Sequence, residues 1–236
     1  MRYGEIRRAQ FEARPNRFLA QVRLPDGTPV TAHVKNTGRC AELLVPGAAV
    51  YLDYHADPRR KTPCDLVAVE KRTPQGVRLI NMDSAAPNAA AAEWLAAGGL
   101  GRLEHLRAEY TLGDSRFDFY AEQAGRPVLV EVKGCTLEQD GLARFPDAPT
   151  QRGVKHVNEL AAWAQKGWRC CVLIVIQMQS VCRFAPNWAT HPAFGHALHA
   201  AAAAGVEIRA MDCTVTPDGM WLRVPVPVDL EPPAGV

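Results

Sequence analysis

The sequence predicts a chain of α/β (α+β) class, with a small OB-like β-barrel followed by a larger domain that has a mixed central sheet flanked by helices. Two observations predict this organisation. Residues 1–84 form short strand-like segments separated by turns, whereas strand-like and helix-like segments alternate after residue 105. Between them lies an alanine-rich segment of helical character. We therefore expect one unit over residues 1–84 and a second over residues 85–236.

The first unit is predicted to contain five or six short strands, and turn-forming residues at 25–27 (PDG) and 36–38 (NTG) separate some of them. The candidate strands are GEIRRAQFEAR (4–14), RFLAQVRL (17–24), PVTAHV (29–34), AAVYLDYH (48–55), CDLVAVEKR (64–72) and VRLINMD (77–83). Strands of this length and spacing suit an OB-like barrel, although an SH3-like or other small barrel has the same pattern. OB-like barrels often bind nucleic acid through a strand face and its loops.

The second unit is predicted to begin with a helix over residues 83–99, which Asp83 or Ser84 can cap and Gly98 and Gly99 can end. The further elements are expected as a strand pair at 106–112 and 115–122, a strand from 128, a helix at 150–167, an apolar strand at 168–178, a helix at 191–205 and a strand at 206–215. Irregular segments are expected at 140–150, a turn-rich loop, and at 224–236, a loosely ordered arm with four prolines.

The composition is typical of a soluble globular protein, with 47% hydrophobic and 22% charged residues. The opening residues, MRYGEIRRAQFEARPNRF, are charged and contain no apolar run, so no secretory signal is expected. The most apolar run, CCVLIVI at 170–176, is too short to cross a bilayer, so no membrane role is expected. The 7 cysteines have neither a CxxC nor a zinc-type spacing, which indicates free thiols in a reducing cytoplasm.

Charge is divided unevenly along the chain. Residues 1–84 carry 14 Lys and Arg against 9 Asp and Glu, whereas the remainder carries 13 and 16 of the totals of 27 and 25. A basic first unit beside a more acidic second unit suggests a module that binds a polyanion next to one that uses carboxylates. Chance is the alternative explanation for an imbalance of this size.

The strand VLVEVK (128–133) combines a buried character with two charges. Because side chains alternate along a strand, its valines face one way, and Glu131 and Lys133 both face the other. The preceding strand carries Asp118 on its polar side, and the short AGRP turn (124–127) predicts that the two strands form a hairpin. Asp118 and Glu131 are then expected to lie close together, beside Lys133.

Two carboxylates at short range repel each other unless a cation lies between them. Mg²⁺ or Mn²⁺ is the natural candidate, with Asp118 and Glu131 as ligands and a backbone carbonyl, such as that of Val132, as a further one. Lys133 could orient or help deprotonate the attacking water and balance charge on a phosphate. The two carboxylates, the lysine and the metal are the minimum set of groups needed for phosphodiester hydrolysis. The alternative is a solvated Glu-Lys pair, but the apolar flank of the strand favours the metal site.

Seven phrases spread over nearly the whole chain carry a family resemblance. They are RPNRFLAQV, AHVKNTGR, ELLVPG, INMDSAAPN, SRFDF, EVKGCTL and FPDAPTQRGVKHVNEL, in that order. From residue 3 to about residue 222 the chain resembles the sugar fermentation stimulation protein A family, SfsA. The resemblance implies an OB-like domain, then a domain of the PD-(D/E)xK nuclease-like fold, and DNA binding that is mostly non-specific. It also implies a regulatory link to sugar metabolism.

The resemblance also implies site residues. The nuclease-type motif falls on Asp118, Glu131 and Lys133, and Glu93 of the first predicted helix is a further acidic candidate for the catalytic set. For Glu93, a position on the protein surface is the alternative. The sequence departs from the family pattern at Gly134-Cys135, which replaces a small hydroxyl residue and a valine. This departure leaves all four candidate residues intact.

Basic residues of both units are candidates for contacts with nucleic-acid phosphates. Arg152 and Lys155 lie at the start of the helix 150–167, where the amino end of a helix favours phosphate, so we expect them to hold the scissile or an adjacent phosphate. The candidates in the first unit are Arg14, Arg17, Lys35, Arg39, Arg59, Arg60 and Lys61. A solvated helix face is the alternative for the first group, and a solvated loop for the run Arg59 to Lys61.

Two functions from different classes follow. One is a Mg²⁺- or Mn²⁺-dependent nuclease on a basic, DNA-binding, cytoplasmic chain. The other is a non-catalytic DNA-binding regulatory protein that retains the nuclease fold. A metal-dependent hydrolase of another phosphoester is a more remote third. The sequence leaves open whether the DNA is single- or double-stranded, and whether the chain is a monomer or a homodimer.

Overall fold

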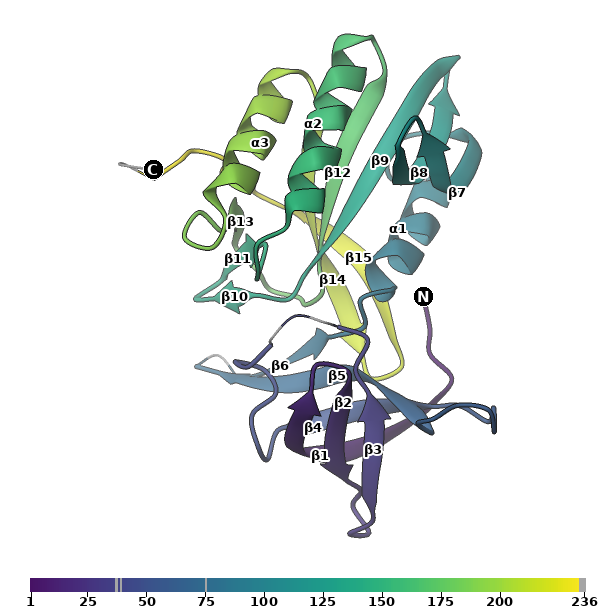
Figure 1. Cartoon of the computed structure of the whole chain (residues 1–236), viewed down its shortest axis with the longest axis vertical. Coiled ribbons are helices and arrows are strands. Elements are labelled where there is room, and N and C mark those ends of the chain that lie inside the picture. The colour runs from purple at the N-terminus through teal and green to yellow at the C-terminus, as the bar shows by residue number, and fades with distance from the viewer. Residues whose placement is uncertain (37, 39, 75, 234–236) are drawn as a thin grey trace.

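The computed structural model describes residues 1–36, 38, 40–74 and 76–233, which form two units stacked along the long axis of the molecule (Figure 1). The smaller unit holds the first six strands, and every helix among the described residues belongs to the larger unit. The amino terminus lies against the larger unit, because the amide of Tyr3 donates to the carbonyl of Asp218 at 2.8 Å.

The first unit is a closed barrel. Its strands are β1 (Glu5–Asn16), β2 (Leu19–Arg23), β3 (Pro29–His33), β4 (Ala49–Tyr54), β5 (Cys64–Thr73) and β6 (Gly76–Asn81). They follow the order β3-β2-β1-β4-β5-β6, and a parallel contact between His33 and Asp65 joins β3 to β5 and closes the barrel. Register shifts around Ala13 accompany the pairing of the long β1 with both β2 and β4. This strand order is that of an OB barrel with β6 added, which confirms the predicted OB-like fold.

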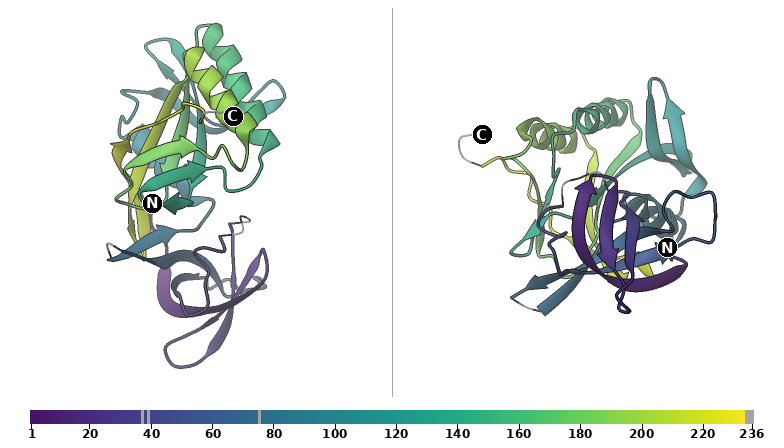
Figure 2. Two further views of the ribbon diagram at one scale, coloured as in Figure 1. Left: turned by 90° about the vertical axis from the view of Figure 1, so that its left-hand side faces the viewer. Right: turned by 60° about the horizontal axis from the view of Figure 1, so that its bottom comes forward.

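The second unit is a mixed sheet flanked by helices, as predicted. Its elements are α1 (Ala86–Ala96), β7 (Glu104–Leu112), β8 (Ser115–Gln123), β9 (Arg126–Cys135), β10 (Glu138–Gln139), β11 (Leu142–Phe145), α2 (Gln151–Gln165), β12 (Arg169–Ile176), β13 (Arg183–Pro186), α3 (Pro192–Ala203), β14 (Glu207–Thr216) and β15 (Gly219–Val226). The large sheet has the order β15-β14-β12-β9-β8-β7, with β9, β12 and β14 parallel to one another. α1 covers one face, and α2 and α3 lie side by side on the other (Figures 1 and 2).

The alternation predicted for β9 is observed. Val128, Val130 and Val132 pack in the cluster that includes α1, whereas Leu129 packs on the opposite face, in the cluster that includes α2 and α3. Residues 170–176 of β12 are completely buried, as expected for a central strand covered on both faces. β9 therefore carries its charged residues on the α2 side of a well-packed sheet.

Two segments predicted to be irregular contain strands. Segment 140–150 contains β11, which pairs antiparallel with β10 and parallel with β13. Segment 224–236 begins within β15, which pairs with β14, and its Val228 forms a bridge to Phe184. Both predictions were wrong, because the pairing of β11 with the distant β13, and of β15 with the adjacent β14, outweighs local turn and proline signals.

The two helices α1 and α2 differ in how their first turns are capped. Thr150 caps α2, accepting a 3.1 Å hydrogen bond from the amide of Gly153. α1 instead has Ala85 at its cap position, and Asp83 accepts a 2.8 Å hydrogen bond from the amide of Ala85.

Within the described residues, none of the helices has both the length and the apolar character required to span a membrane. All seven cysteines are free thiols, and only Cys182 is exposed.

Candidate metal centre

The β8–β9 hairpin brings the two predicted metal ligands together. A two-residue turn at 124–125 joins the strands and sets their register. Asp118 of β8 lies beside Val132 of β9, whose amide donates a 2.7 Å hydrogen bond to Oδ2 of Asp118. Glu131 immediately precedes Val132, so both carboxylates lie at the same place on the sheet. The hairpin predicted from the AGRP turn is thus confirmed.

Asp118 joins three elements of the fold. Its Oδ1 accepts a 2.8 Å hydrogen bond from Nδ2 of Asn88 on α1, while its Oδ2 is bound to β9. Burial, and next the negative charge of Glu131, raise the pKa of Asp118, and these effects outweigh the Val132 and Asn88 hydrogen bonds and the positive charge of Lys133. The raised pKa means that the surroundings do not fully compensate the negative charge of the ionised carboxylate. A bound cation would supply the missing positive charge.

Glu131 is almost completely buried, with 3% of its surface exposed. Its Oε1 accepts a hydrogen bond from Nζ of Lys133 and lies 2.6 Å from Nδ1 of His156 on α2. Burial alone would raise the pKa of Glu131, but the His156 hydrogen bond and the charge of Lys133 outweigh burial and lower it. Glu131 is therefore ionised, with its cationic and hydrogen-bonding neighbours gathered at one oxygen.

The donor set fits a divalent cation that needs few protein ligands. Oε2 of Glu131 is buried and has no hydrogen-bond partner within the described residues, an arrangement that is costly unless a ligand completes it. No group of three or more His, Cys, Asp or Glu side chains in the described chain is arranged to hold a metal. A pair of carboxylates differs from a closed structural zinc site, which has four protein ligands, and offers the oxygen ligands that a hard divalent cation prefers.

His156 is a site residue that the sequence reasoning did not assign. Besides its contact with Glu131, it receives a long 3.5 Å hydrogen bond from Nε of Arg152 to its Nε2. The ring of His156 therefore lies between Arg152 and Glu131, with one ring nitrogen facing each. The available signal was helical spacing, since residue 156 lies one turn after residue 152 and a buried histidine there can face the sheet.

Arg152 and Lys155 lie where the sequence reasoning expected, in the first turns of α2 next to His156. Lys155 is half exposed and forms a 3.6 Å ion pair with Glu159. Glu93 is not brought to this centre. Its carboxylate is 56% exposed and accepts a 2.6 Å hydrogen bond from the amino group of Met1, and on α1 it is Asn88 that reaches Asp118.

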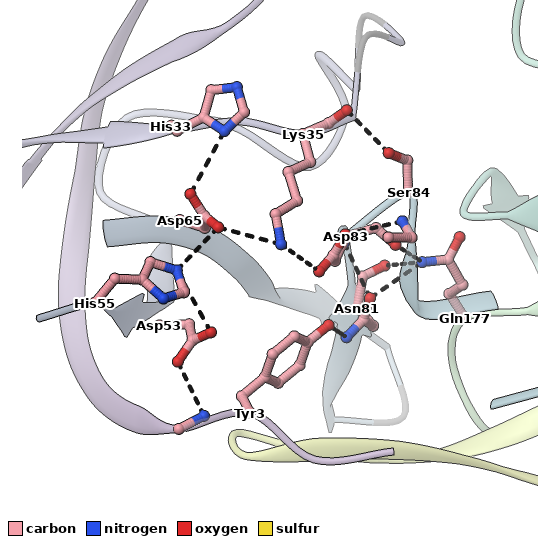
Figure 3. Close-up of polar contacts among 12 residues, drawn as sticks. Tyr3, His33, Lys35, Asp53, His55, Asp65, Asn81, Asp83, Ser84 and Gln177 are labelled. Atoms are coloured by element: carbon pink, nitrogen blue, oxygen red, sulfur yellow. Dashed lines mark hydrogen bonds and ion pairs between the residues drawn. The ribbon is translucent and has the colours of Figure 1, made fainter. Parts of the chain in front are cut away.

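Lys35 lies in a network of the first unit next to the second unit, most of which Figure 3 shows, rather than on a free surface. We call this network the junction cluster, which comprises His33, Lys35, Asp53, His55, Arg60, Asp65 and Asp83. Nζ of Lys35 lies 3.1 Å from Oδ2 of Asp65 and 2.9 Å from Oδ2 of Asp83. Burial alone would lower the pKa of Lys35, but the hydrogen bonds to Asp83 and Asp65 raise it. Lys35 thus holds two buried carboxylates, and the expectation that it contacts phosphate conflicts with this position.

Two more basic candidates act within the first unit. Arg60 pairs with the buried carboxylate of Asp65. Arg14 donates 2.8 Å hydrogen bonds to the carbonyls of Gly38, Arg17 and Asn36. These guanidinium groups hold loops together, a role that sequence could not distinguish from phosphate binding because both need a long cationic side chain near turns.

The remaining basic candidates of the first unit are exposed or undescribed. Arg17 lies over the half-exposed ring of Phe18 at 4.9 Å, and Lys61 is exposed. Arg59 is 89% exposed and pairs only with Asp57 two residues away. Arg39 lies outside the described residues. Arg17, Arg59 and Lys61 thus remain accessible to an external anion.

Comparisons with known proteins agree over nearly the whole chain. The family model of the sugar fermentation stimulation protein RE domain matches residues 85–219, and that of the SfsA N-terminal OB domain matches residues 13–80. The sugar fermentation stimulation protein homolog of Desulfitobacterium hafniense strain Y51 is 50% identical over 220 residues, covering 93% of this chain and 94% of the relative. The homolog of Ruminiclostridium cellulolyticum is 47% identical over 216 residues, covering 91% and 93%. The solved structure of Pyrococcus furiosus SfsA in complex with Ca²⁺ superposes with a TM-score of 0.84 at 27% identity, covering 97% and 98% of the two chains.

Proposed function

Since the chain belongs to the sugar fermentation stimulation protein family, we propose on this basis and from its site that it binds DNA without sequence preference and hydrolyses phosphodiester bonds with a divalent cation. The observation that carries the proposal is the buried Oε2 of Glu131, which has no hydrogen-bond partner in the described part of the chain and lies beside Asp118, whose pKa is raised. Ionised carboxylates are costly to bury in pairs, so this pair is best explained by a cation that binds between them.

Asp118 and Glu131 would hold the metal, which we take to be Mg²⁺ or Mn²⁺. The Pyrococcus furiosus relative, at 27% identity, was solved with Ca²⁺, another hard cation that prefers oxygen ligands. When bound, such a cation polarises a phosphate oxygen and makes water a better nucleophile at neutral pH. The sparse protein ligand set leaves positions for water and for the substrate phosphate.

The other residues of the centre would position these groups. Asn88 and the Val132 amide fix Asp118, and His156 fixes Glu131. Lys133 lies against Glu131, so its ammonium can donate to the attacking water or to a non-bridging phosphate oxygen. Such pre-positioned donors lower the barrier because they need no reorganisation as charge develops on the phosphate.

DNA binding would rely on the basic side chains that remain accessible. These are Arg17, Arg59 and Lys61 on the barrel, and Arg152 and Lys155 beside the metal centre. Binding of this kind is mainly electrostatic, so the affinity should fall steeply with salt and vary little with sequence. A salt-independent affinity measured by fluorescence anisotropy would contradict it.

Free thiols on all seven cysteines are consistent with a cytoplasmic location.

The second candidate is a DNA-binding regulator that retains the nuclease fold without catalysis, with a link to sugar metabolism. It is favoured by one observation, that Lys133 and His156 both bind Oε1 of Glu131 and so stabilise this buried carboxylate without a metal. Both candidates bind DNA, and they differ only in whether the metal centre catalyses phosphodiester cleavage.

Cleavage by the wild type, Asp118→Asn and Glu131→Gln separates the two candidates. Single- and double-stranded DNA would be offered with Mg²⁺, with Mn²⁺ and with EDTA. We expect metal-dependent cleavage by the wild type and at least a 100-fold loss, on the order of a lost metal ligand, in both variants. Glu93→Gln is the control, because Glu93 contacts Met1 and should leave cleavage unchanged. Equal cleavage by wild type and both variants would remove the enzyme proposal.

A further inference from the structure

An open pocket of about 530 Å³ lies between the turn that joins β7 to β8 and the first turns of α2. Its polar walls include Asp114, Ser115, Arg116, Arg152, Lys155 and His156. Neither carboxylate of the metal centre lines it. The pocket is therefore adjacent to the candidate metal centre but separate from it.

Positive charge dominates the walls of this pocket. Arg116, Arg152 and Lys155 supply three cations against the single carboxylate of Asp114. The second unit otherwise carries more acidic than basic residues, so a cationic pocket within it is a local exception. The amino end of α2 adds the positive end of a helix dipole at the same place. These features select an anion.

The cations are available to an incoming ligand. Arg116 is 56% exposed and pairs with Glu109 at 3.5 Å, a partner that is itself 69% exposed. Lys155 is 53% exposed and pairs with Glu159 at 3.6 Å. Exposed ion pairs of this length are weak, so exchanging them for a phosphate costs little.

Ser115 gives an independent sign that the pocket is incomplete. Only 5% of its surface is exposed, yet in the described chain its Oγ has no hydrogen-bond partner. Buried hydroxyl groups are normally paired, because leaving one unpaired costs free energy. A phosphate oxygen or the hydration of a bound phosphate would provide the missing partner.

The pocket is joined to the metal centre through one side chain. His156 lines the pocket, and its Nδ1 lies 2.6 Å from Oε1 of Glu131. A nucleic-acid strand that places one phosphate at the metal centre, beside Glu131, can therefore place a neighbouring phosphate in the pocket. The adjacent carboxylates repel a phosphate, and the three pocket cations offset this repulsion by neutralising its charge.

We infer that this pocket is a second phosphate subsite, which holds a non-scissile phosphate of the strand while its neighbour lies at the metal centre. The inference rests on the proposed function and adds Ser115 and Arg116 to the residues that contact the substrate. The phosphate is either an internal phosphodiester or a terminal phosphate of the strand, two sources with one chemistry. By holding it, the subsite determines which bond is presented to Asp118 and Glu131.

The test measures binding without cleavage. Fluorescence anisotropy is recorded in EDTA for Glu131→Gln as the parent and for the same chain with Arg116→Gln and Lys155→Gln added. We expect the two added changes to weaken oligonucleotide binding about tenfold or more and to reduce the salt slope by about 1, as for one lost phosphate contact. Binding within twofold of the parent, with an unchanged slope, would overturn the subsite.

A matched control carries Arg183→Gln and Lys166→Gln in the same parent. These residues are also one exposed arginine and one exposed lysine of the second unit, and they contact Asp229 and Trp163 away from the pocket. The control should bind like the parent. An equal loss in the control would mean that general charge, not the pocket, binds the strand, and would overturn the inference.

Ser115→Ala tests the buried hydroxyl separately. Because Oγ has no partner among the residues that the structure describes, its removal should not lower the unfolding midpoint, whereas binding should weaken several-fold. Unchanged binding would overturn the role of Ser115. Oligonucleotides with and without 5′- or 3′-terminal phosphates identify the source, since a loss on all of them indicates an internal phosphodiester and a loss only on phosphorylated ends indicates a terminal phosphate.

The inference and the proposed function fail in different ways. If the Glu131→Gln parent binds no nucleic acid, the proposed DNA binding fails. If the parent binds and the pocket variants bind equally well, only the subsite fails.

Discussion

The junction cluster and the metal centre contain the same residue types, but they differ in how completely the buried carboxylates are paired. In the junction cluster, both oxygens of Asp65 have cationic or imidazole partners, namely Arg60 and His33 at Oδ1 and Lys35 and His55 at Oδ2. In the metal centre, Oε2 of Glu131 has no partner in the described chain. A buried carboxylate that the protein fully satisfies stabilises the fold, and one that it leaves incomplete is available to a ligand.

The aspartates of the two clusters also differ in the direction in which their pKa values shift. Burial alone would raise the pKa of Asp65, but Lys35, and then His55 and Arg60, lower it. For Asp118, burial and the charge of Glu131 raise the pKa despite a nearby lysine. A lysine within a carboxylate cluster is therefore no guide to function by itself, and the balance of partners around each oxygen decides.

The largest expected difference is in stability. Asp65→Asn removes a buried anion and leaves Lys35 and Arg60 without their shared partner, so we expect the free energy of unfolding to fall by about 3–5 kcal/mol. Asp118→Asn should cost much less, because its carboxylate is already unfavourable when ionised. Urea denaturation of both variants measures the difference. Equal losses would show that the two clusters are not distinct in this respect.

Metal binding should distinguish the clusters next. A divalent cation at 100 times its dissociation constant stabilises the folded chain by about 2.7 kcal/mol. We expect thermal unfolding of the wild type and of Asp65→Asn to shift upward with Mn²⁺ and to return with EDTA. Glu131→Gln should show no shift. A shift that survives in Glu131→Gln but disappears in Asp65→Asn would move the metal site to the junction cluster.

The support around Asp118 should have a smaller effect. Asn88→Ala removes the donor that orients Oδ1 of Asp118 and leaves both metal ligands in place. We expect about a tenfold loss of Mn²⁺ affinity, or about 1.4 kcal/mol, as for other groups that orient a metal ligand. Isothermal titration calorimetry measures this affinity. Glu93→Gln, on the same helix, is the control and should bind Mn²⁺ like the wild type.

The smallest effect is the response to pH, and its sign differs between the clusters. Because folding lowers the pKa of Asp65, its contribution is present above the ordinary value of 3.8 and is lost as the pH falls below it. Because folding raises the pKa of Asp118, its ionisation costs stability as the pH rises above 3.8. The slope is at most about 1.4 kcal/mol per pH unit for one group.

Unfolding free energies at pH 3 to 6, in metal-free buffer, test these signs. The difference between wild type and Asp65→Asn should shrink toward low pH. The difference between wild type and Asp118→Asn should move the opposite way. Parallel trends would contradict the assignment of the two carboxylates to different classes.

Local patterns predicted most of the fold and part of the site. The alternation in VLVEVK located the faces of β9, and the short turn before it predicted the hairpin that brings Asp118 to Val132. Glu93 shows the limit of such reasoning. The sequence places it on the correct helix, but only the packing of α1 shows that Asn88 turns toward Asp118 and that Glu93 meets Met1.

The sequence by itself determined the order of most strands and helices, the division of charge, and the pairing of a carboxylate and an ammonium on one face of β9. These follow from side-chain alternation and turn chemistry, which act over a few residues. Tertiary structure alone decided that Lys35 binds Asp65 and Asp83, that β11 is a strand, and that His156 reaches Glu131. Those contacts join residues far apart in the chain, so which donor meets which carboxylate depends on how the sheet and helices pack.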